Sequence, residues 1–363
     1  MHPFRILCTV TFLCGLLLPM SANAQPAGAK GDDFLYRVVQ GDTLGDLAQR
    51  YTMNFSNWSA LQRINGIDDP YRLPIAKLLR IPFSMIPLRE SAARVLHLTG
   101  QASADGRALS SGSSVQEGQT VETGPNGFVT LQLSDESIVS IPPSTSVVVR
   151  RLREFTSVGL TDSVFDMKAG TIETQVAPND TGVGRFEVRT PVSVTGVRGT
   201  RLRVHATPEG SRSEVVTGMA GVDGSAASEV VLRRQQGVAV DSLGKSLGVR
   251  KLLAAPRLSP PVRGPGGWSA QFEPVDGAAS YLVSVARDPE GGRLVSRQRI
   301  DAPPARFAAS GPGTHYVFVR ALDAAGIGGL DAHEAFEGAF VLSDQSGTPV
   351  LAGDGSLIIV ADY

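Results

Sequence analysis

Apolar and polar residues alternate along the middle of the chain, from about residue 90 to residue 248. In the clearest example, Val129, Leu131 and Leu133 fall on one face of an extended segment, while Thr130 and Gln132 fall on the other. Further short apolar runs follow at intervals of about ten residues, separated by Gly, Pro, Asn and Asp. This pattern predicts a β-sandwich, a β-barrel or a stacked β-sheet for residues 90–248.

A second β-rich stretch runs from residue 271 to residue 341. Tyr281, Val283 and Val285 recur at every second position, as expected for a strand with one buried face. Between the two stretches, residues 249–270 are rich in Pro and Gly, which favours a linker.

The pattern before residue 90 has the period of a helix. Apolar residues fall at i, i+3, i+4 and i+7, which places them on one face. These residues are Leu44, Leu47, Ala48 and Tyr51. Asp42 or Thr43 can cap this helix, with Asp46 three residues beyond Thr43, and Gly41 lets the chain turn sharply into it.

A second helix is predicted to begin near Ser56 and to end at Gly66, with Trp58, Leu61 and Ile64 on its buried side. Leu78–Pro82 then returns as a strand. Residues 34–83 thus form a β-α-α-β unit, preceded by a polar linker at 25–33. The predicted fold class is a mainly β, multidomain protein with one small α+β unit.

Residues 34–83 resemble a LysM domain. The resemblance is carried by Tyr36-x-Val38-x-x-Gly41-Asp42-Thr43-Leu44, Ala48-x-x-Tyr51, Leu61-x-x-x-Asn65-Gly66 and Leu79-x-Ile81-Pro82. The family binds glycans that contain N-acetylglucosamine, which in bacteria implies peptidoglycan as the partner. By this resemblance the glycan-binding residues are those of two loops: Gly41, Asp42, Thr43, Leu44, Gly66, Ile67, Asp68, Asp69 and Pro70. One departure is Pro74-Ile75-Ala76-Lys77, where the family usually has Gly-Gln, so we expect a different turn there.

The middle stretch resembles a FecR domain, with its core at 118–205. The resemblance rests on Glu122–Gly127, on Phe186-Glu187-Val188-Arg189-Thr190-Pro191 and on Val197-Arg198-Gly199-Thr200-x-Leu202-x-Val204. It implies a β-rich exported module suited to protein contacts. In its namesake this domain belongs to a membrane signal transducer that controls a sigma factor, but this chain shows neither a cytoplasmic anti-sigma segment nor a transmembrane helix.

Residues 271–341 resemble a fibronectin type III-like sandwich. The resemblance implies that Tyr316 is a buried Tyr that closes a corner through its hydroxyl, and that Phe272 takes the place of the usual core Trp. Such modules serve as spacers or as binding surfaces.

The two ends of the chain bear on its location. Residues 1–24 have Arg5, an apolar run from Ile6 to Leu18 and a small-x-small site at the end, which predicts a cleaved signal peptide and a periplasmic or cell-envelope protein. Residues 342–363 are predicted to be a tail that contains Gly and Ser.

Composition narrows the function further. Both cysteines lie within the first 24 residues, so the exported chain has neither disulfides nor thiolate metal sites. The chain has 34 basic and 35 acidic residues, and loss of Arg5 with the signal peptide leaves a formal charge of −2, which gives no electrostatic basis for binding nucleic acid. No apolar run of about 18 residues follows the signal segment, so no membrane span is predicted after cleavage.

No enzyme, cofactor or metal site is predicted. The four remaining His residues have no metal-ligand spacing, and they are His97, His205, His315 and His333. Gly244-x-Ser246-x-Gly248 matches the nucleophile-elbow string but lacks the strand-to-helix context that the string requires. Arg198–Arg201 can form either an anion site or a solvated strand face, and so can Arg150, Arg151 and Arg153; the solvated face is favoured for both groups.

Two functional hypotheses remain. The first is a non-enzymatic cell-envelope protein that binds peptidoglycan through residues 34–83 and presents its β domains to other envelope proteins. The alternative is a periplasmic regulatory component of an envelope-sensing system that acts through a separate membrane partner.

Overall fold

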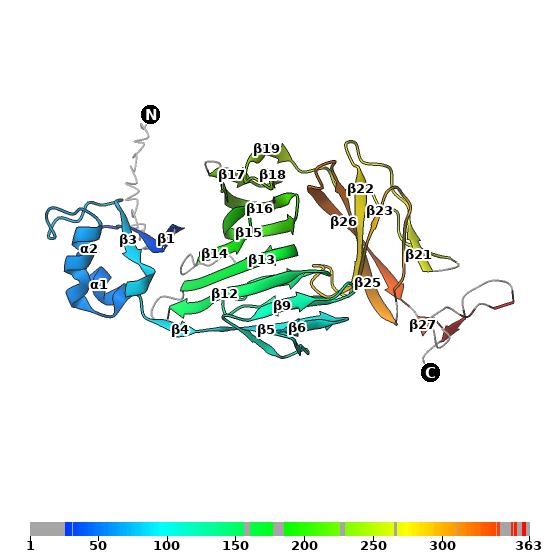
Figure 1. Cartoon of the computed structure of the whole chain (residues 1–363), viewed down its shortest axis with the longest axis horizontal. Helices are drawn as coiled ribbons and strands as arrows, with labels where there is room; N and C mark the ends of the chain where they lie inside the picture. The colour runs from blue at the N-terminus through cyan, green and yellow to red at the C-terminus, as the bar shows by residue number, and fades with distance from the viewer. Residues whose placement is uncertain are drawn as a thin grey trace, which may run out of the picture.

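The computed structural model of the chain comprises three units joined end to end (Figure 1). We call them the N-terminal unit (residues 26–86), the middle unit (residues 88–251) and the C-terminal unit (residues 262–338). The structure describes residues 26–30, 32–155, 160–176, 185–225, 229–264, 267–309, 311–338, 340–341, 350, 352–353 and 358–360. The predicted signal peptide at 1–24 lies outside these residues, as does most of the predicted tail.

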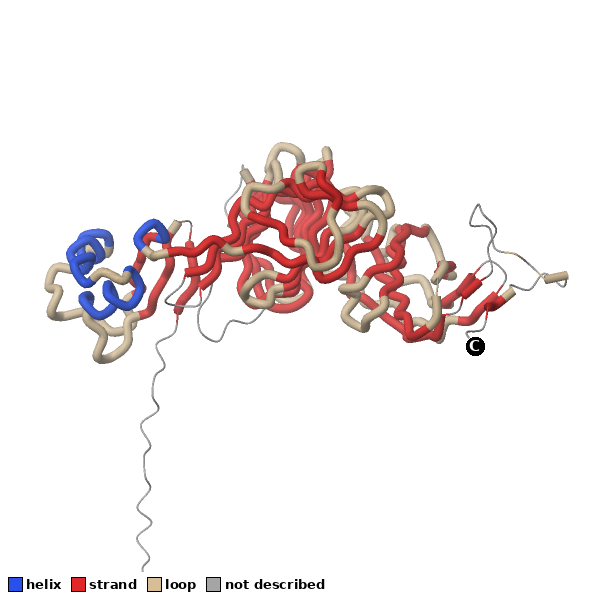
Figure 2. The backbone as a smooth tube through the Cα atoms, turned by 90° about the horizontal axis from the view of Figure 1, so that it is seen from below, coloured by secondary structure: helices blue, strands red, loops and turns tan. Residues whose placement is uncertain are grey.

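The N-terminal unit holds both α-helices of the described chain, packed on a small sheet (Figures 1 and 2). Its elements are β1 (Pro26–Lys30), β2 (Asp33–Arg37), α1 (Leu44–Thr52), the 3-10 turn η1 (Phe55–Asn57), α2 (Trp58–Ile64), β3 (Leu78–Pro82) and the 3-10 turn η2 (Phe83–Met85). The strands are ordered β1-β2-β3, and both pairings are antiparallel. Strand β1 occupies most of the segment that the sequence predicts to be a linker.

The helix predictions for this unit are largely confirmed. The predicted stripe of α1 is buried, because Leu44, Leu47, Ala48 and Tyr51 all lie in the core of the unit. In α2, Leu61 is fully buried and Trp58 packs against the same core. The prediction for Ile64 was wrong: its side chain is 38% exposed, because Asn65 and not Ile64 joins the end of α2 to β3, through hydrogen bonds with the backbone of Arg80.

The middle unit is one 16-stranded sheet. Most of it follows the path β19-β18-β16-β15-β14-β13-β11-β10-β5-β8, and its pairings are antiparallel except for that of β13 with β14. The strands are β4 (Leu88–Glu90), β5 (Ala92–Thr99), β6 (Ala102–Ala104), β7 (Arg107–Ala108), β8 (Ser114–Gln116), β9 (Thr120–Thr123), β10 (Phe128–Gln132), β11 (Ile138–Ile141), β12 (Ser146–Phe155), β13 (Leu160–Gln175), β14 (Arg185–Arg189), β15 (Ser193–Thr207), β16 (Gly210–Gly224), β17 (Val230–Arg233), β18 (Gln236–Asp241) and β19 (Ser246–Lys251).

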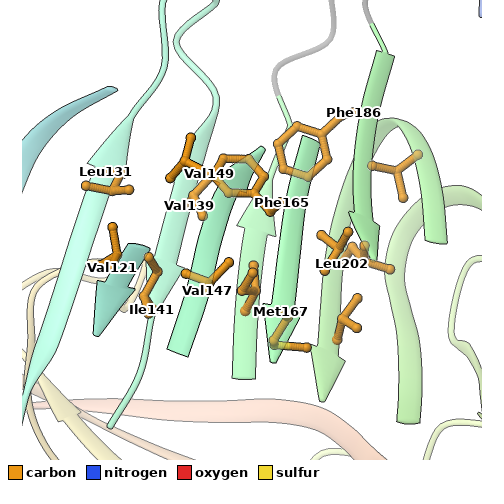
Figure 3. Packing of buried hydrophobic residues seen from close by; sticks show 14 of the residues in the cluster. Val121, Leu131, Val139, Ile141, Val147, Val149, Phe165, Met167, Phe186 and Leu202 are labelled. Carbon is orange, nitrogen blue, oxygen red and sulfur yellow. The ribbon is translucent and has the colours of Figure 1, made fainter. Parts of the chain in front are cut away.

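The core of the middle unit is formed by alternate residues of many strands. Figure 3 shows side chains from β9 to β15 meeting on one side of the sheet, including Leu131, Phe165 and Phe186. The rings of Phe165 and Phe186 lie 5.6 Å apart, centre to centre. The predicted alternation is confirmed, since Val129, Leu131 and Leu133 are all buried in this core. On β10, β13 and β15 the opposite face carries polar side chains that contact the C-terminal unit, among them Thr130, Glu173 and Arg203.

The C-terminal unit has two facing sheets. One contains β20 (Val262–Gly264), β21 (Gly267–Ala270) and β24 (Ala305–Phe307), and the other contains β22 (Ser280–Ala286), β23 (Leu294–Ile300), β25 (Gly313–Leu322) and β26 (Gly328–Gly338). A further pair joins β27 (Phe340–Val341) to β28 (Ile359–Val360). Parts of the predicted linker at 249–270 form the end of β19 and strands β20 and β21.

The prediction for Tyr316 was wrong. Tyr316 lies on the face of β25 that points away from the core of the C-terminal unit, because the core residues of this strand are its neighbours Val317 and Val319. The buried tyrosine is Tyr281, whose hydroxyl accepts a hydrogen bond from the backbone N–H of Val275 at 2.8 Å. Its ring contacts Phe272, which lies in the core as predicted.

Aromatic packing fixes the N-terminal unit to the middle unit. Phe83 of η2 stacks on Phe155 of β12 with ring centres 5.0 Å apart, and Leu160 belongs to the same buried cluster. The guanidinium of Arg185 lies 5.0 Å from the centre of the Phe83 ring and forms an ion pair with the buried Asp162 at 2.6 Å. The two units therefore share a hydrophobic core.

A buried network of ion pairs fixes the middle unit to the C-terminal unit. We call it the ion network: Glu173, Arg203 and Glu214 of the middle unit with Arg297, Arg320 and Asp331 of the C-terminal unit. Across the interface, Glu173 pairs with Arg297 at 2.9 Å and with Arg320 at 3.3 Å, and Arg203 pairs with Asp331. Arg203 also pairs with Glu214 at 3.3 Å, and Arg320 with Asp331 at 2.7 Å.

Removing one charge from this network should destabilise both units. We expect Glu214→Gln to lower the free energy of unfolding by about 3 kcal/mol, because Glu214 is fully buried and Arg203 would lose a charged partner in a dry site. Urea unfolding, followed by the fluorescence of Trp268 in a Trp58→Phe background, measures the change. The matched control, Glu273→Gln at an exposed position, should change it by less than about 0.5 kcal/mol. Equal values for the two variants would contradict the assignment.

The same network predicts a loss of stability in acid. Burial alone would raise the pKa of Glu173, Glu214 and Asp331. Neighbouring arginines, together with His205 beside Glu214, outweigh burial and bring the pKa of each carboxyl below its ordinary value. A carboxyl whose pKa falls on folding stabilises the protein above its ordinary pKa, and this contribution is lost as the pH falls toward the lowered value. The free energy of unfolding should therefore fall below about pH 4.5, and less steeply in Glu214→Gln. Urea titrations at pH 7, 5, 4 and 3 test this, and parallel slopes for the two proteins would contradict it.

Candidate functional site

The first predicted loop is a sharp turn between β2 and α1. Gly41 has φ 93°, a conformation that favours glycine, and its backbone is exposed. The Asp42 carboxylate accepts hydrogen bonds from the Tyr36 hydroxyl and from the Val39 N–H, both at 2.8 Å. Burial and the hydrogen bond to Asp42 raise the pKa of Tyr36, so this hydroxyl stays a donor. Asp42 thus stabilises the turn through these two hydrogen bonds.

The last two residues of this loop start the helix. Thr43 is the N-cap of α1, since its hydroxyl accepts a hydrogen bond from the Asp46 N–H at 3.1 Å and donates one to the Asp46 carboxylate at 2.7 Å. Leu44 is 1% exposed and lies in the core. Capping by Thr43 confirms one of the two predicted alternatives.

The second predicted loop, Gly66–Pro70, follows α2. Ile67 is buried in the core of the unit and anchors the loop, while its backbone carbonyl accepts a hydrogen bond from the Gln62 side chain at 2.9 Å. Gly66, Asp68 and Asp69 are exposed. The Asp69 carboxylate accepts a hydrogen bond from the Tyr71 N–H at 2.9 Å, which closes a turn at the end of the loop.

A short turn connects the two loops. The backbone of Val38 pairs with Ala76 and Lys77, at 2.9 and 3.0 Å, and the Lys77 ammonium lies 3.5 Å from the Gly66 carbonyl. This turn is Pro74–Lys77, the predicted departure from the family pattern, and Ala76 adopts φ 66° within it. The turn thus contacts the second loop directly and the strand end that leads into the first loop. In the two loops, Gly41, Gly66, Asp68 and Asp69 are exposed, and Leu44 and Ile67 are buried.

Two exposed apolar side chains beside these loops were missed by the sequence analysis. Tyr71 is 95% exposed and directly follows the second loop, and Ile75 is 65% exposed in the connecting turn. Both lie in a Pro-containing segment that predicts only a loop. Such a segment has no helix or strand periodicity from which their exposure could be predicted. An exposed aromatic ring next to backbone donors and acceptors is suited to a sugar, which presents both an apolar ring face and hydroxyls.

The other sites that the sequence suggested are explained by structure. Gly244-x-Ser246-x-Gly248 lies in the hairpin between β18 and β19, where no helix follows. Arg150 is exposed and paired with Asp166, whereas Arg151 and Arg153 are partly buried in ion pairs with Asp162 and Glu117. The solvated face predicted for these arginines is therefore correct for Arg150 alone. The side chain of Arg198 lies outside the described residues.

Neither a metal site nor a membrane-spanning helix appears in the described part of the chain. Its His, Cys, Asp and Glu residues form no group of three that could hold a metal ion. Its helices include none that is both long and apolar enough to cross a membrane.

Comparisons with known families agree with the two main resemblances. Residues 36–82 match the LysM domain model, and residues 119–221 match the model described as FecR protein. The chain therefore contains a LysM domain and a FecR domain, which lie in the N-terminal and middle units. The C-terminal unit lies outside both matches, so its likeness to fibronectin type III stays a prediction.

Solved structures give a weaker similarity. Two crystal structures, both described as a "putative anti-sigma factor" from Parabacteroides distasonis, are 22% and 21% identical to this chain, with TM-scores of 0.31 and 0.30. Each similarity covers 36% of this chain and 59% of the other. No curated protein matches the chain.

The cap of α1 can be tested on its own. Thr43→Ala should lower the free energy of unfolding of the LysM domain by about 1 kcal/mol, because the Asp46 N–H loses its acceptor. Thr43→Ser keeps the hydroxyl and serves as the control. Urea unfolding followed by the fluorescence of Trp58, in a Trp268→Phe background, measures both variants. Identical stability of the Ala and Ser variants would show that the cap contributes nothing.

Proposed function

We propose that this protein is a non-enzymatic component of the cell envelope that binds the N-acetylglucosamine-containing glycan of peptidoglycan through its LysM domain. The supporting observation is the surface formed by the two loops of a domain from a glycan-binding family. Gly41 and Gly66 are exposed in these loops, and Tyr71 offers a ring on which a sugar can stack. A single such site binds weakly, with a Kd on the order of 10 μM to 1 mM.

The FecR domain and the C-terminal unit serve, in this proposal, as surfaces for other envelope proteins. LysM and FecR proteins are usually associated with the envelope, and neither family is catalytic. Export through the predicted signal peptide would place the chain in the periplasm. Because Phe83 and Phe155 join the LysM domain to the FecR domain, glycan binding would hold the whole chain close to the peptidoglycan.

A second candidate function is supported by the FecR domain. The domain is named for a regulator of sigma-factor signalling, and a LysM domain would give such a regulator a way to sense the cell wall. In this version the protein acts through a separate membrane partner, and the glycan-binding loops report the state of the wall.

Retention on purified peptidoglycan sacs tests the first proposal. Deleting the LysM domain is a poor test, because deletion would expose Phe155 and Leu160 of the FecR domain. Tyr71→Ala is better, since Tyr71 is almost fully exposed and its loss should leave the fold intact. We expect the chain from residue 25 onward to be retained, and Tyr71→Ala to raise its Kd by about tenfold, because a buried ring face contributes roughly 1–2 kcal/mol.

The control for this test is Leu247→Ala, which removes a half-exposed apolar side chain from β19, far along the chain. It should bind like the unaltered chain. Failure of the unaltered chain to bind the sacs would refute the proposal. Release of soluble glycan fragments during incubation would contradict the absence of enzymatic activity.

A further inference from the structure

A pocket of about 370 Å³ lies between the FecR domain and the C-terminal unit. The polar face of the sheet forms its floor, with Ser140 of β11, Gln175 of β13 and Arg201 of β15. The loop from Asp288 to Arg293, which joins β22 to β23, forms its opposite wall. Domain interfaces are frequent positions for ligand pockets, and this volume is within the range that small ligands occupy.

The loop is held in place on both sides of the pocket. The Thr130 hydroxyl donates to the Gly292 carbonyl, and the Thr99 hydroxyl donates to the Leu294 carbonyl at 2.8 Å. The Asp288 carboxylate turns back on its own loop and accepts hydrogen bonds from the N–H groups of Gly292 and Arg293, at 2.9 and 2.6 Å. The pocket therefore exists before any ligand arrives.

The charged groups around the pocket differ in how well they are paired. Glu173, at the inner end, is neutralised by Arg297 and Arg320. Arg201 is only partly exposed, and its guanidinium makes one long hydrogen bond, at 3.4 Å, to the Glu290 carbonyl. Across the described residues, no carboxylate lies within ion-pair distance of Arg201.

A second arginine, Arg203, lies deeper in the pocket, and its charge is already balanced by Glu214 and Asp331 of the ion network. Arg203 lines the pocket two residues along β15 from Arg201, and its side chain is 1% exposed. Its Nε–H donor finds no hydrogen-bond partner within the described structure. Arg201 is therefore the guanidinium of this pocket that can take an anionic ligand, because its planar donors match the two oxygens of a carboxylate.

The rest of the lining is mixed: Thr130, Thr174, Asp288 and Glu290 are polar or acidic, and Leu96 and Ile138 are apolar. Leu96 of β5 is 43% exposed, and Ile138 of β11 lines the same pocket, with β10 between the two strands. We propose that this pocket binds a ligand that joins a carboxylate to a short apolar body, with Arg201 holding the carboxylate and Leu96 and Ile138 covering the apolar part. The C-terminal end of a peptide and a free N-acyl amino acid share this chemistry.

Calorimetric titration of the full chain from residue 25 onward tests the proposal with three probes. They are N-acetyl-leucine, the peptide acetyl-Ala-Ala-Ala-Leu with a free carboxylate, and the same peptide with a C-terminal amide. We expect at least one free acid to bind with a Kd on the order of 0.1–1 mM, and the amide to bind at least tenfold more weakly than the acid peptide if that peptide binds. Tighter binding of the peptide assigns the pocket to chain ends, whereas tighter binding of N-acetyl-leucine assigns it to small molecules.

Three variants make the result specific to the pocket. Arg201→Gln should weaken binding of the acid at least tenfold, and Ser140→Phe should block it by filling the floor while leaving every charge in place. Arg233→Gln removes an exposed arginine of β17 outside the pocket and should have no effect. Unchanged thermal unfolding midpoints show that the variants fold. Equal affinity for acid and amide, no binding of either acid, or unchanged binding by Arg201→Gln would overturn the proposal.

This inference does not depend on the glycan-binding proposal. Tyr71→Ala, which should weaken retention on peptidoglycan sacs, should leave the titration with the acid probes unchanged, so failure of one proposal can be told from failure of the other.

Discussion

The ion network between the FecR domain and the C-terminal unit is the constraint on which the arrangement of the molecule depends. Of its six groups, the FecR domain contributes Glu173, Glu214 and Arg203, an excess of one negative charge, and the C-terminal unit contributes Arg297, Arg320 and Asp331, an excess of one positive charge. Only together are the buried charges balanced. A charge that stays buried without a partner is strongly destabilising. The two units can therefore separate at this interface only if water enters and hydrates the charges. Thr99 and Thr130 add hydrogen bonds to the loop at Asp288–Arg293, which fixes the wall of the pocket beside Arg201.

The LysM domain is fixed to the FecR domain by a shared hydrophobic cluster instead of by an ion network. Phe83, Phe155 and Leu160 form part of one buried cluster, and the Arg185–Asp162 pair lies next to it. A LysM domain on a flexible linker would only keep its partners nearby. A LysM domain that shares a core with the FecR domain also fixes the orientation of the two domains relative to each other. A glycan bound at Gly41 and Gly66 would then determine which face of the FecR domain points away from the wall.

Local patterns were enough to predict the elements of the LysM and FecR domains, because periodicity depends on neighbouring residues. The stripe of α1 and the alternation around Leu131 are examples. For the same reason, local patterns could not predict the interfaces between the units. Arg203 and Asp331 are 128 residues apart, and nothing in either local sequence shows that they meet. Tyr316 was misassigned because its strand has two buried faces, one toward its own core and one toward the FecR domain. Within the predicted glycan site, the loops were located correctly, but the sequence could not separate Leu44 and Ile67, which support the loops, from Tyr71, which is exposed beside them.

We infer that the three units form one rigid body, with the proposed glycan-binding loops at one end. The chain from residue 25 onward contains no cysteine, so spin labels can be placed at will. The most direct test is double electron–electron resonance between labels at Ser59→Cys in the LysM domain and Asp301→Cys in the C-terminal unit, both exposed positions. One rigid body should give a single narrow distance distribution that is the same with and without peptidoglycan sacs. A broad distribution, or one that narrows only when sacs are added, would contradict it.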